Sequence, residues 1–328
     1  MTTYKGIQGF NIQNLSADPS NFEEGQVWYN STSNVWKVGE LTTVGAWATG
    51  GNLNTARHSG GAAGIQTAAL FAAGGQPFAS VAGQTEEYNG TSWTITNPVN
   101  TARVYMGAAG TQTAGLVFAG EETAQSTATE EYDGNSWTSV NPMISAKIAL
   151  GSTGTQTAAL SFGGAGPGGY TSTTEEYDGN SWTSGNPLNT IKEQPAGAGI
   201  QTAALSFGGR TPPGTTTLLA ATEEYDGTSW TSVNSMNTAR RNLAGCGTQT
   251  AALAFGGQTP PNTGATEEYD GTSWATNPGS MGTARGYLEG CGTQPAGLAI
   301  GGYTTDNTAA TEEYTGAGAP QTKTITAS

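Results

Sequence analysis

The sequence is poor in the residues on which most catalytic and metal sites depend. Its 328 residues include one histidine, His58, and two cysteines, Cys246 and Cys291. One histidine cannot supply a histidine pair or a multi-histidine metal set, and it offers little basis for a Ser-His-Asp arrangement. The two cysteines occupy equivalent places too far apart for a disulfide, so they are expected to be small buried fillers. We therefore predict a protein that is not an enzyme and needs no metal or cofactor.

Basic residues and long apolar runs are also scarce. The chain has 11 Lys and Arg against 25 Asp and Glu, which gives a net charge of −14. Without a basic stripe to neutralise phosphates, nucleic acid is not an expected partner. No stretch approaches the roughly 18 apolar residues that span a bilayer, so no membrane partner is expected. Residues 1–10 lack the pattern of a signal peptide, which predicts synthesis in the cytoplasm without export.

The main feature of the sequence is an internal repeat. Glu-Glu-Tyr triplets recur at intervals of 44, 45, 48, 44 and 45 residues. A repeat of this length predicts a stack of similar units, each burying its faces against its neighbours. The triplets end at Tyr88, Tyr132, Tyr177, Tyr225, Tyr269 and Tyr314.

Each copy carries the signals of four short strands. In the fifth copy, residues 240–247 supply one strand, and residues 250–255 form a short apolar run that ends at Gly256 and Gly257. The alternating run at 266–269 is followed by Asp270 and Gly271, a strong hairpin signal, and then by a strand at Trp274. Each copy is therefore predicted to be a four-stranded antiparallel sheet.

Six such sheets predict an all-β, six-bladed β-propeller over residues 41–318. The last copy has Ala319 where its tryptophan is expected, and an extra tryptophan, Trp47, precedes the first copy. A strand around Trp47 that pairs with residues 312–314 would close the ring. Residues 319–328 are left as a tail or an edge strand.

The repeat resembles the kelch repeat, because a glycine doublet ends its second strand and a tryptophan follows the tyrosine by five residues. The second copy departs, with Phe118-Ala119-Gly120. The resemblance implies a kelch-like propeller of structural or binding function. The doublets are Gly74-Gly75, Gly163-Gly164, Gly208-Gly209, Gly256-Gly257 and Gly301-Gly302.

A basic residue precedes the first strand of every copy. The simplest interpretation is a structural ring of ion pairs with the triplet glutamates that ties the blades together. Side chains alternate along a strand, so one glutamate of each pair faces the base, but the sequence does not say which. The basic residues are Arg57, Arg103, Lys147, Lys192, Arg240 and Arg285.

The loops between the second and third strands differ from copy to copy. Equivalent loops of a propeller emerge on one face, and loops on a rigid scaffold often carry binding sites. The alternative is that the variation is tolerated drift. The loop residues suited to gripping a ligand are Phe78, Tyr170, Arg210, Leu218, Leu219 and Tyr303.

Residues 1–40 stand outside the repeat, and two aromatic runs around residues 31–34 predict a β-hairpin. The segment GQVWYNSTSNVWKV is similar to short modules of structural proteins of tailed bacteriophages, in capsid-decorating and tail-fibre proteins. This resemblance implies a docking segment, with Trp28, Tyr29 and Trp36 in contact with a capsid or tail protein or with another copy of the chain. The alternative is a hairpin that packs on the propeller.

Two functions remain compatible with the sequence. The first is a virion structural protein of a tailed phage, docked through residues 1–40 and displaying the propeller for decoration or for adhesion to host polysaccharide. The second is a bacterial propeller outside any virion that binds carbohydrate or protein through its loops. The missing export signal favours the first, because assembly inside a cell needs none.

Overall fold

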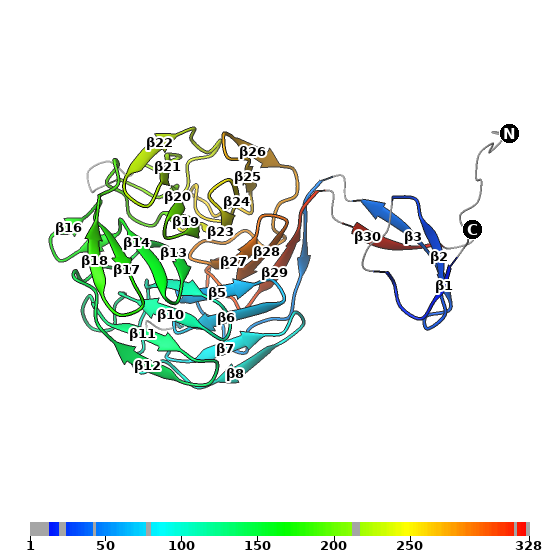
Figure 1. Ribbon diagram of the computed structural model, residues 1–328, viewed down its shortest axis with the longest axis horizontal. Coiled ribbons are helices and arrows are strands. Elements are labelled where there is room, and N and C mark those ends of the chain that lie inside the picture. The colour runs from blue at the N-terminus through cyan, green and yellow to red at the C-terminus, as the bar shows by residue number, and fades with distance from the viewer. Residues whose placement is uncertain are drawn as a thin grey trace. The chain divides into compact units, whose positions relative to one another are not determined.

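The computed structural model describes residues 13–19, 24–41, 44–76, 80–211, 217–317 and 320–325 (Figure 1). The chain divides into two compact units. One contains residues 46–315, and the other combines residues 1–45 with residues 316–328. Each unit is a β structure of its own.

The larger unit is the predicted six-bladed propeller. Within the described residues it contains six four-stranded antiparallel sheets around a common centre, where β5, β13, β19, β23 and β27 lie in Figure 1. The innermost strands are β5 (Gly61–Ile65), β9 (Gly107–Gly110), β13 (Gly151–Thr155), β19 (Ala196–Ile200), β23 (Ala244–Thr248) and β27 (Glu289–Thr293). The second strands are β6 (Ala68–Ala72), β10 (Gly115–Phe118), β14 (Ala158–Phe162), β20 (Ala203–Phe207), β24 (Ala251–Phe255) and β28 (Ala296–Ile300).

The outer half of each blade is built from the Glu-Glu-Tyr strand and the tryptophan strand. The third strands are β7 (Thr85–Tyr88), β11 (Thr129–Tyr132), β17 (Thr174–Tyr177), β21 (Thr222–Tyr225), β25 (Thr266–Tyr269) and β29 (Thr311–Thr315). The fourth strands are β8 (Trp93–Thr96), β12 (Trp137–Val140), β18 (Trp182–Gly185), β22 (Trp230–Val233), β26 (Trp274–Asn277) and β4 (Ala46–Thr49). A small hairpin, β15 (Ala165–Gly166) with β16 (Gly169–Tyr170), extends the third blade.

The ring is closed by the strand around Trp47, as predicted. β4 pairs antiparallel with β29, so that Trp47 lies opposite Tyr314. The Trp47 indole donates a hydrogen bond to Thr266 Oγ1 at 2.8 Å and packs on Phe255 and Tyr314, with ring centroids 4.9 and 5.1 Å away. The sixth blade is thus completed by a strand that comes from the start of the chain.

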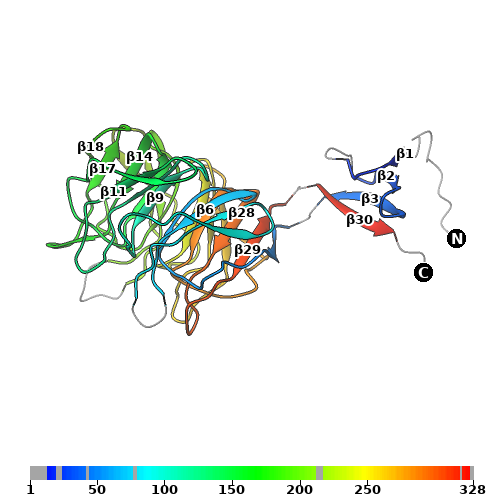
Figure 2. The ribbon, with the colours of Figure 1, turned by 90° about the horizontal axis from the view of Figure 1, so that it is seen from below.

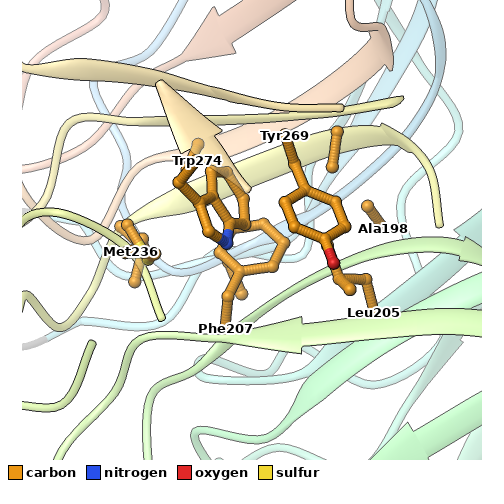
Figure 3. Close-up of a cluster of buried hydrophobic side chains, with 10 residues drawn as sticks. Ala198, Leu205, Phe207, Met236, Tyr269 and Trp274 are labelled. Atoms are coloured by element: carbon orange, nitrogen blue, oxygen red, sulfur yellow. The ribbon is translucent and has the colours of Figure 1, made fainter. Parts of the chain in front are cut away.

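Aromatic side chains fill the spaces between blades. Trp274 of the fifth blade packs between Tyr269 of its own blade and Phe207 of the fourth, with ring centroids 5.0 and 4.9 Å away (Figure 3). Met236 lies beside them in the same buried cluster. The second strands read as continuous apolar runs because both of their faces are buried between neighbouring sheets.

The glycine doublet is one residue earlier in the first blade than the sequence suggested. The two equivalent positions have positive φ in every blade, and in the first they are Ala73 (53°) and Gly74 (109°) rather than Gly74 and Gly75. The second blade has Ala119 (61°) and Gly120 (90°). A φ near 60° lies in the left-handed helical region, which an alanine can occupy at some cost, whereas a φ near 100° favours glycine. Only the second glycine of the doublet is therefore present in all six blades.

The smaller unit is a four-stranded sheet built from both ends of the chain. Its order is β1 (Gln13–Leu15), β2 (Val27–Asn30), β3 (Val35–Leu41) and β30 (Pro320–Ile325). The predicted hairpin is present as β2 and β3, and β1 lies parallel to β2. The C-terminal segment, left open as a tail or an edge strand, is an edge strand of this sheet beside β3 (Figure 2).

Candidate functional site

The six basic residues form buried ion pairs with the first glutamate of each triplet. This settles which of the two glutamates faces the base. The pairs are Arg57–Glu86 (2.6 Å), Arg103–Glu130 (3.1 Å), Lys147–Glu175 (3.3 Å), Lys192–Glu223 (3.2 Å), Arg240–Glu267 (3.0 Å) and Arg285–Glu312. Burial lowers the pKa of Arg240 to about 10, although the adjacent Glu267 carboxylate opposes this shift.

These pairs do not tie one blade to the next, which corrects the prediction. Arg240 lies on the segment that enters the fifth blade, and its partner Glu267 lies on β25 of that same blade. The other oxygen of Glu267 accepts a hydrogen bond from the backbone N–H of Asn237 on the same segment, at 2.6 Å. Each first glutamate therefore anchors the incoming connection to its own blade.

The second glutamate of each triplet does join neighbouring blades. The Tyr132 hydroxyl donates to Glu87 of the preceding blade at 2.7 Å, and burial followed by this bond raises the pKa of Tyr132 to about 12. Tyrosine and glutamate make the same contact at all six blade interfaces. The pairs are Tyr88–Glu313, Tyr132–Glu87, Tyr177–Glu131, Tyr225–Glu176, Tyr269–Glu224 and Tyr314–Glu268.

Two further hydrogen bonds repeat at every interface. The tryptophan of each fourth strand donates to the threonine just before the Glu-Glu-Tyr triplet of the preceding blade, as Trp137 does to Thr85 at 2.9 Å. Each glutamine of the turn after the first strand donates to two backbone carbonyls of the preceding blade, as Gln112 does to those of Ala69 and Tyr88. All four side chains of the Thr-Glu-Glu-Tyr run are thus engaged in contacts within and between blades, and its carboxylates form no separate site.

A second set of equivalent positions surrounds the centre of the ring. Two residues after each basic residue, the chain turns through the left-handed region with φ between 50° and 59°. At most of these turns the backbone N–H donates to the equivalent carbonyl of the preceding blade, as Tyr105 does to Ser59 at 2.8 Å. We call these six the mouth residues: Ser59, Tyr105, Ala149, Gln194, Asn242 and Tyr287.

The mouth residues line a cavity of about 120 Å³ at the centre of the ring. It adjoins a second cavity of about 130 Å³ further along the innermost strands. Most side chains that those strands present to the two cavities are no larger than serine, threonine or cysteine. The exception is Glu289 at the start of β27, where the other five blades have glycine or alanine.

The side chains around the first cavity, called here the central cavity, are unevenly distributed. Tyr105 and Tyr287 lie together with ring centroids 6.2 Å apart, and His58 packs against both at 6.2 and 5.9 Å. Gln194 and Asn242 come from the fourth and fifth blades. The cavity therefore has an aromatic side and an amide side.

Several polar groups at the cavity have no partner within the described residues. The Gln194 Oε1 atom is buried and accepts no hydrogen bond. Glu289 forms no ion pair or hydrogen bond with any described residue, and burial raises the pKa of its carboxyl well above the ordinary value. Unpartnered buried polar atoms are uncommon in folded proteins and call for an explanation, such as a ligand or bound water.

The loop residues predicted to bind a ligand do not form one site. Arg210 bonds to Glu193 Oε2 at 2.6 Å and lies over the Tyr170 ring, 5.8 Å from its centroid. Leu218 pairs with Arg210 through the backbone, and Leu219 is partly buried beside it. Tyr303 is separate from this group and packs against His58, with ring centroids 6.2 Å apart. Phe78 lies outside the described residues.

The mouth residues were not predicted, because the longest variable segments of the sequence are the loops between the second and third strands. A signal was nevertheless present. Each mouth residue follows a basic residue by two positions, within a segment that is otherwise similar in every copy. Aligning the copies on the basic residue would have shown that the positions one and two residues later vary most.

The predicted docking residues lie on the small sheet. Trp28 is buried, and its indole donates to Asp18 Oδ1 at 3.0 Å. Tyr29 and Trp36 lie opposite each other on β2 and β3, with ring centroids 5.4 Å apart, and Trp36 is 43% exposed. One tryptophan thus supports the sheet, while the other is available at its surface.

Neither cysteine forms a disulfide. Cys246 and Cys291 are buried free thiols, and burial raises the pKa of each. Among the described residues, no group of three or more His, Cys, Asp or Glu side chains is placed to hold a metal ion. The same residues contain no helix long and apolar enough to cross a membrane.

Comparison with known proteins shows the fold. No protein-family model matches the sequence, and no curated protein matches it. A solved structure described as "Structure of YjhT" is similar with a TM-score of 0.67, covering 80% of this chain and 96% of that one. The sequence identity is 12%, so the likeness carries the fold alone. The chain is a β-propeller protein with an added small sheet.

Proposed function

We propose that this chain is a non-enzymatic structural protein of a tailed-phage virion, which attaches through the small sheet and displays the propeller for adhesion. The observation that carries the proposal is the exposed face of the small sheet. Tyr29, Trp36 and Ile325 lie in one row across three strands, and Trp36 and Ile325 are 43% and 46% exposed. Val27 on the same face is 36% exposed.

A single small sheet with one apolar face open to water is a weak folding unit by itself. Sheets become stable when another layer covers their apolar face. Contiguous exposed apolar side chains of this kind mark interaction surfaces. A capsid or tail protein that covers the Tyr29–Trp36–Ile325 row would supply the missing layer, and the similarity of residues 25–38 to phage structural modules favours such a partner.

The absence of a catalytic role is part of the proposal. Each carboxylate of the repeated triplets is engaged in the same contact in every blade, as the Tyr132–Glu87 and Arg240–Glu267 pairs illustrate. Identical use in six copies suits architecture, whereas a single active site would set one copy apart.

The test is to purify particles from a host that produces this chain and to trace it by electron cryo-microscopy. We expect the small sheet to pack on a capsid or tail protein through Trp36 and Ile325. Changing Trp36→Ser with Ile325→Ser should lower the number of copies per particle at least tenfold. Ile95→Ser, at an exposed position of the ring, is the matched control and should leave the copy number unchanged.

A chain found only free of particles, with or without these substitutions, would contradict the virion proposal. The second candidate, a propeller that binds carbohydrate or protein outside a virion, would then stand. The variation of the mouth residues among otherwise similar blades favours that candidate, because a purely structural ring has no need for it.

A further inference from the structure

The central cavity has the size and chemistry of a small-molecule site that no predicted loop residue touches. We propose that it binds one neutral sugar ring, stacked on the Tyr105 and Tyr287 side and hydrogen-bonded by Gln194, Asn242 and Glu289. This inference deepens the adhesion role and rests on the proposed function for its biological setting. All residues of the proposed site belong to the propeller.

The volume fits a single sugar ring. An apolar protein cavity of about 150 Å³ holds one benzene ring. The central cavity of about 120 Å³ adjoins a second one of about 130 Å³, so the two together have room for one sugar ring. A longer oligosaccharide would have to enter by one terminal residue.

The aromatic side suits the apolar face of a sugar. Tyr105 and Tyr287 are partly exposed and lie 6.2 Å apart between ring centroids, with His58 packed against both. Burial lowers the pKa of His58, which favours the uncharged form of this ring. A pyranose presents C–H groups on one face, and these pack on aromatic rings without requiring charge.

The opposite side supplies polar atoms that form no hydrogen bond with any described residue. The buried Gln194 Oε1 atom and the Glu289 carboxyl both have no partner among those residues. Asn242 uses its amide nitrogen on Gln258 at 2.9 Å and keeps its carbonyl oxygen available. Sugar hydroxyls both donate and accept, so they can satisfy an amide oxygen, an amide nitrogen and a carboxyl together.

The charge of the lining selects against acidic sugars. Among the described residues that line the central cavity, none is lysine, arginine or histidine, and one, Glu289, carries a carboxyl group. A carboxylate or phosphate on the ligand would meet no cation there and would face a carboxyl group. Binding is therefore expected for neutral hexoses and not for uronic or sialic acids.

The side chains around the central cavity differ from blade to blade. The Thr-Glu-Glu-Tyr run is identical in all six copies, whereas the mouth residues use five residue types. Glu289 stands where the other blades have Gly61, Gly107, Gly151, Ala196 and Ala244. Variation at these positions among otherwise similar blades is expected of a site that recognises an asymmetric ligand.

The blades themselves provide substitutions that should fold. Ala149 occupies the mouth position of the third blade with φ of 52°, so alanine is tolerated in this turn. Tyr105→Ala with Tyr287→Ala removes the aromatic side, and Gln194→Ala removes the amide. Tyr170→Ala and Ile95→Ser, outside the lining of the cavity, are the matched controls.

The experiment is saturation-transfer NMR on the full chain with D-glucose, D-galactose and L-rhamnose, compared with D-glucuronic acid and N-acetylneuraminic acid. We expect at least one neutral sugar to bind and the acids not to bind. The double tyrosine variant should weaken that binding at least tenfold, Gln194→Ala should weaken it several-fold, and both controls should bind as the unchanged chain does. Circular dichroism checks that every variant is folded.

Three outcomes would overturn the inference: no neutral sugar binds, an acidic sugar binds more tightly, or binding survives in the double tyrosine variant and is lost in a control. None of them depends on particles. If sugar binding is found but the chain is absent from virions, the virion proposal fails alone. If the chain is on virions but the cavity binds no sugar, the inference fails alone.

Discussion

The interfaces between blades and the rim of the central cavity, formed by the mouth residues, are built from the same six repeats. The hydrogen-bonding side chains are the same in every copy at the interfaces, whereas the side chains at the rim differ from copy to copy. Every interface carries the same tyrosine–glutamate, tryptophan–threonine and glutamine–carbonyl hydrogen bonds. At the rim the backbone turn is the same in each blade, but the mouth side chains differ. The interfaces therefore tolerate little change, whereas the rim needs only the backbone turn.

The largest expected effect is the loss of the folded ring at high pH. Burial and bonding to glutamate raise the pKa of Tyr88 and Tyr132 to about 12, above the ordinary value of about 10. The folded state then holds protons that the unfolded chain releases. The stability that these groups contribute is complete below pH 10 and is lost as the pH rises toward 12.

Ultraviolet absorbance of tyrosinate, recorded together with circular dichroism during an alkaline titration, checks this. We expect the interface tyrosines to ionise together with unfolding. Ionisation of all tyrosines near pH 10 with the ring still folded would show that the interfaces do not depend on these bonds.

The next largest effect is expected from opening one buried ion pair. Glu267→Ala leaves the fully buried Arg240 without its carboxylate, and such a change costs about 3–5 kcal/mol of unfolding free energy. Replacing both partners by leucine should recover most of that loss, because no charge is left alone. Urea unfolding of the three proteins measures both values, and a loss below about 1 kcal/mol for Glu267→Ala would contradict the assignment.

A smaller effect is expected from a single interface bond. Tyr132→Phe keeps the ring in place but removes the donor to Glu87, which should lower the unfolding free energy by about 1.5–3 kcal/mol. Tyr105→Phe removes a hydroxyl from the rim, where no described residue accepts from it, and should change stability by less than about 0.5 kcal/mol. Equal losses in urea for the two variants would erase the distinction between interface and rim.

The smallest effect is expected at Glu289, which carries the carboxyl group among the described residues that line the central cavity. Glu289→Ala introduces the residue found at Ala196 and Ala244 and removes a partly buried acid that has no partner among the described residues. The change should therefore raise the unfolding free energy by about 1 kcal/mol. Because the pKa of Glu289 is raised, the gain should be present above the ordinary carboxyl pKa and should vanish at lower pH. The reverse change, Ala196→Glu, should destabilise the ring, and thermal unfolding at two pH values tests both.

Much of the fold was predictable because the same strand and turn signals recur in six copies of the repeat. The Gly256–Gly257 and Asp270–Gly271 signals marked where strands end, and Trp47 indicated how the ring closes. The place of the glycine doublet in the first blade was predicted wrongly. The adjacent glycines Gly74 and Gly75 matched the doublet of the other copies, whereas Ala73 and Gly74 occupy the two equivalent positions in the structure. The residue types alone did not identify the equivalent positions of the first blade. The backbone φ angles identify them.

The candidate site was much less predictable. Tyr170, Arg210 and Tyr303 were predicted to bind a ligand because they lie in loops that vary. In the structure Arg210 lies over the Tyr170 ring, whereas Tyr303 packs against His58. Tyr105 and Gln194 are 89 positions apart in the chain and meet only around the centre of the ring. No local pattern joins residues that belong to different blades.

The sequence by itself determined the number of blades, the strands of each blade and the strand that closes the ring, because short-range turn and strand signals recur in every copy. Only the tertiary structure decided which glutamate meets the base, which contacts join the blades, and that the two ends of the chain share one sheet. Those outcomes depend on the twist and register of strands and on contacts between distant segments. The same dependence brings an aromatic pair, two amides and one acid around a single cavity.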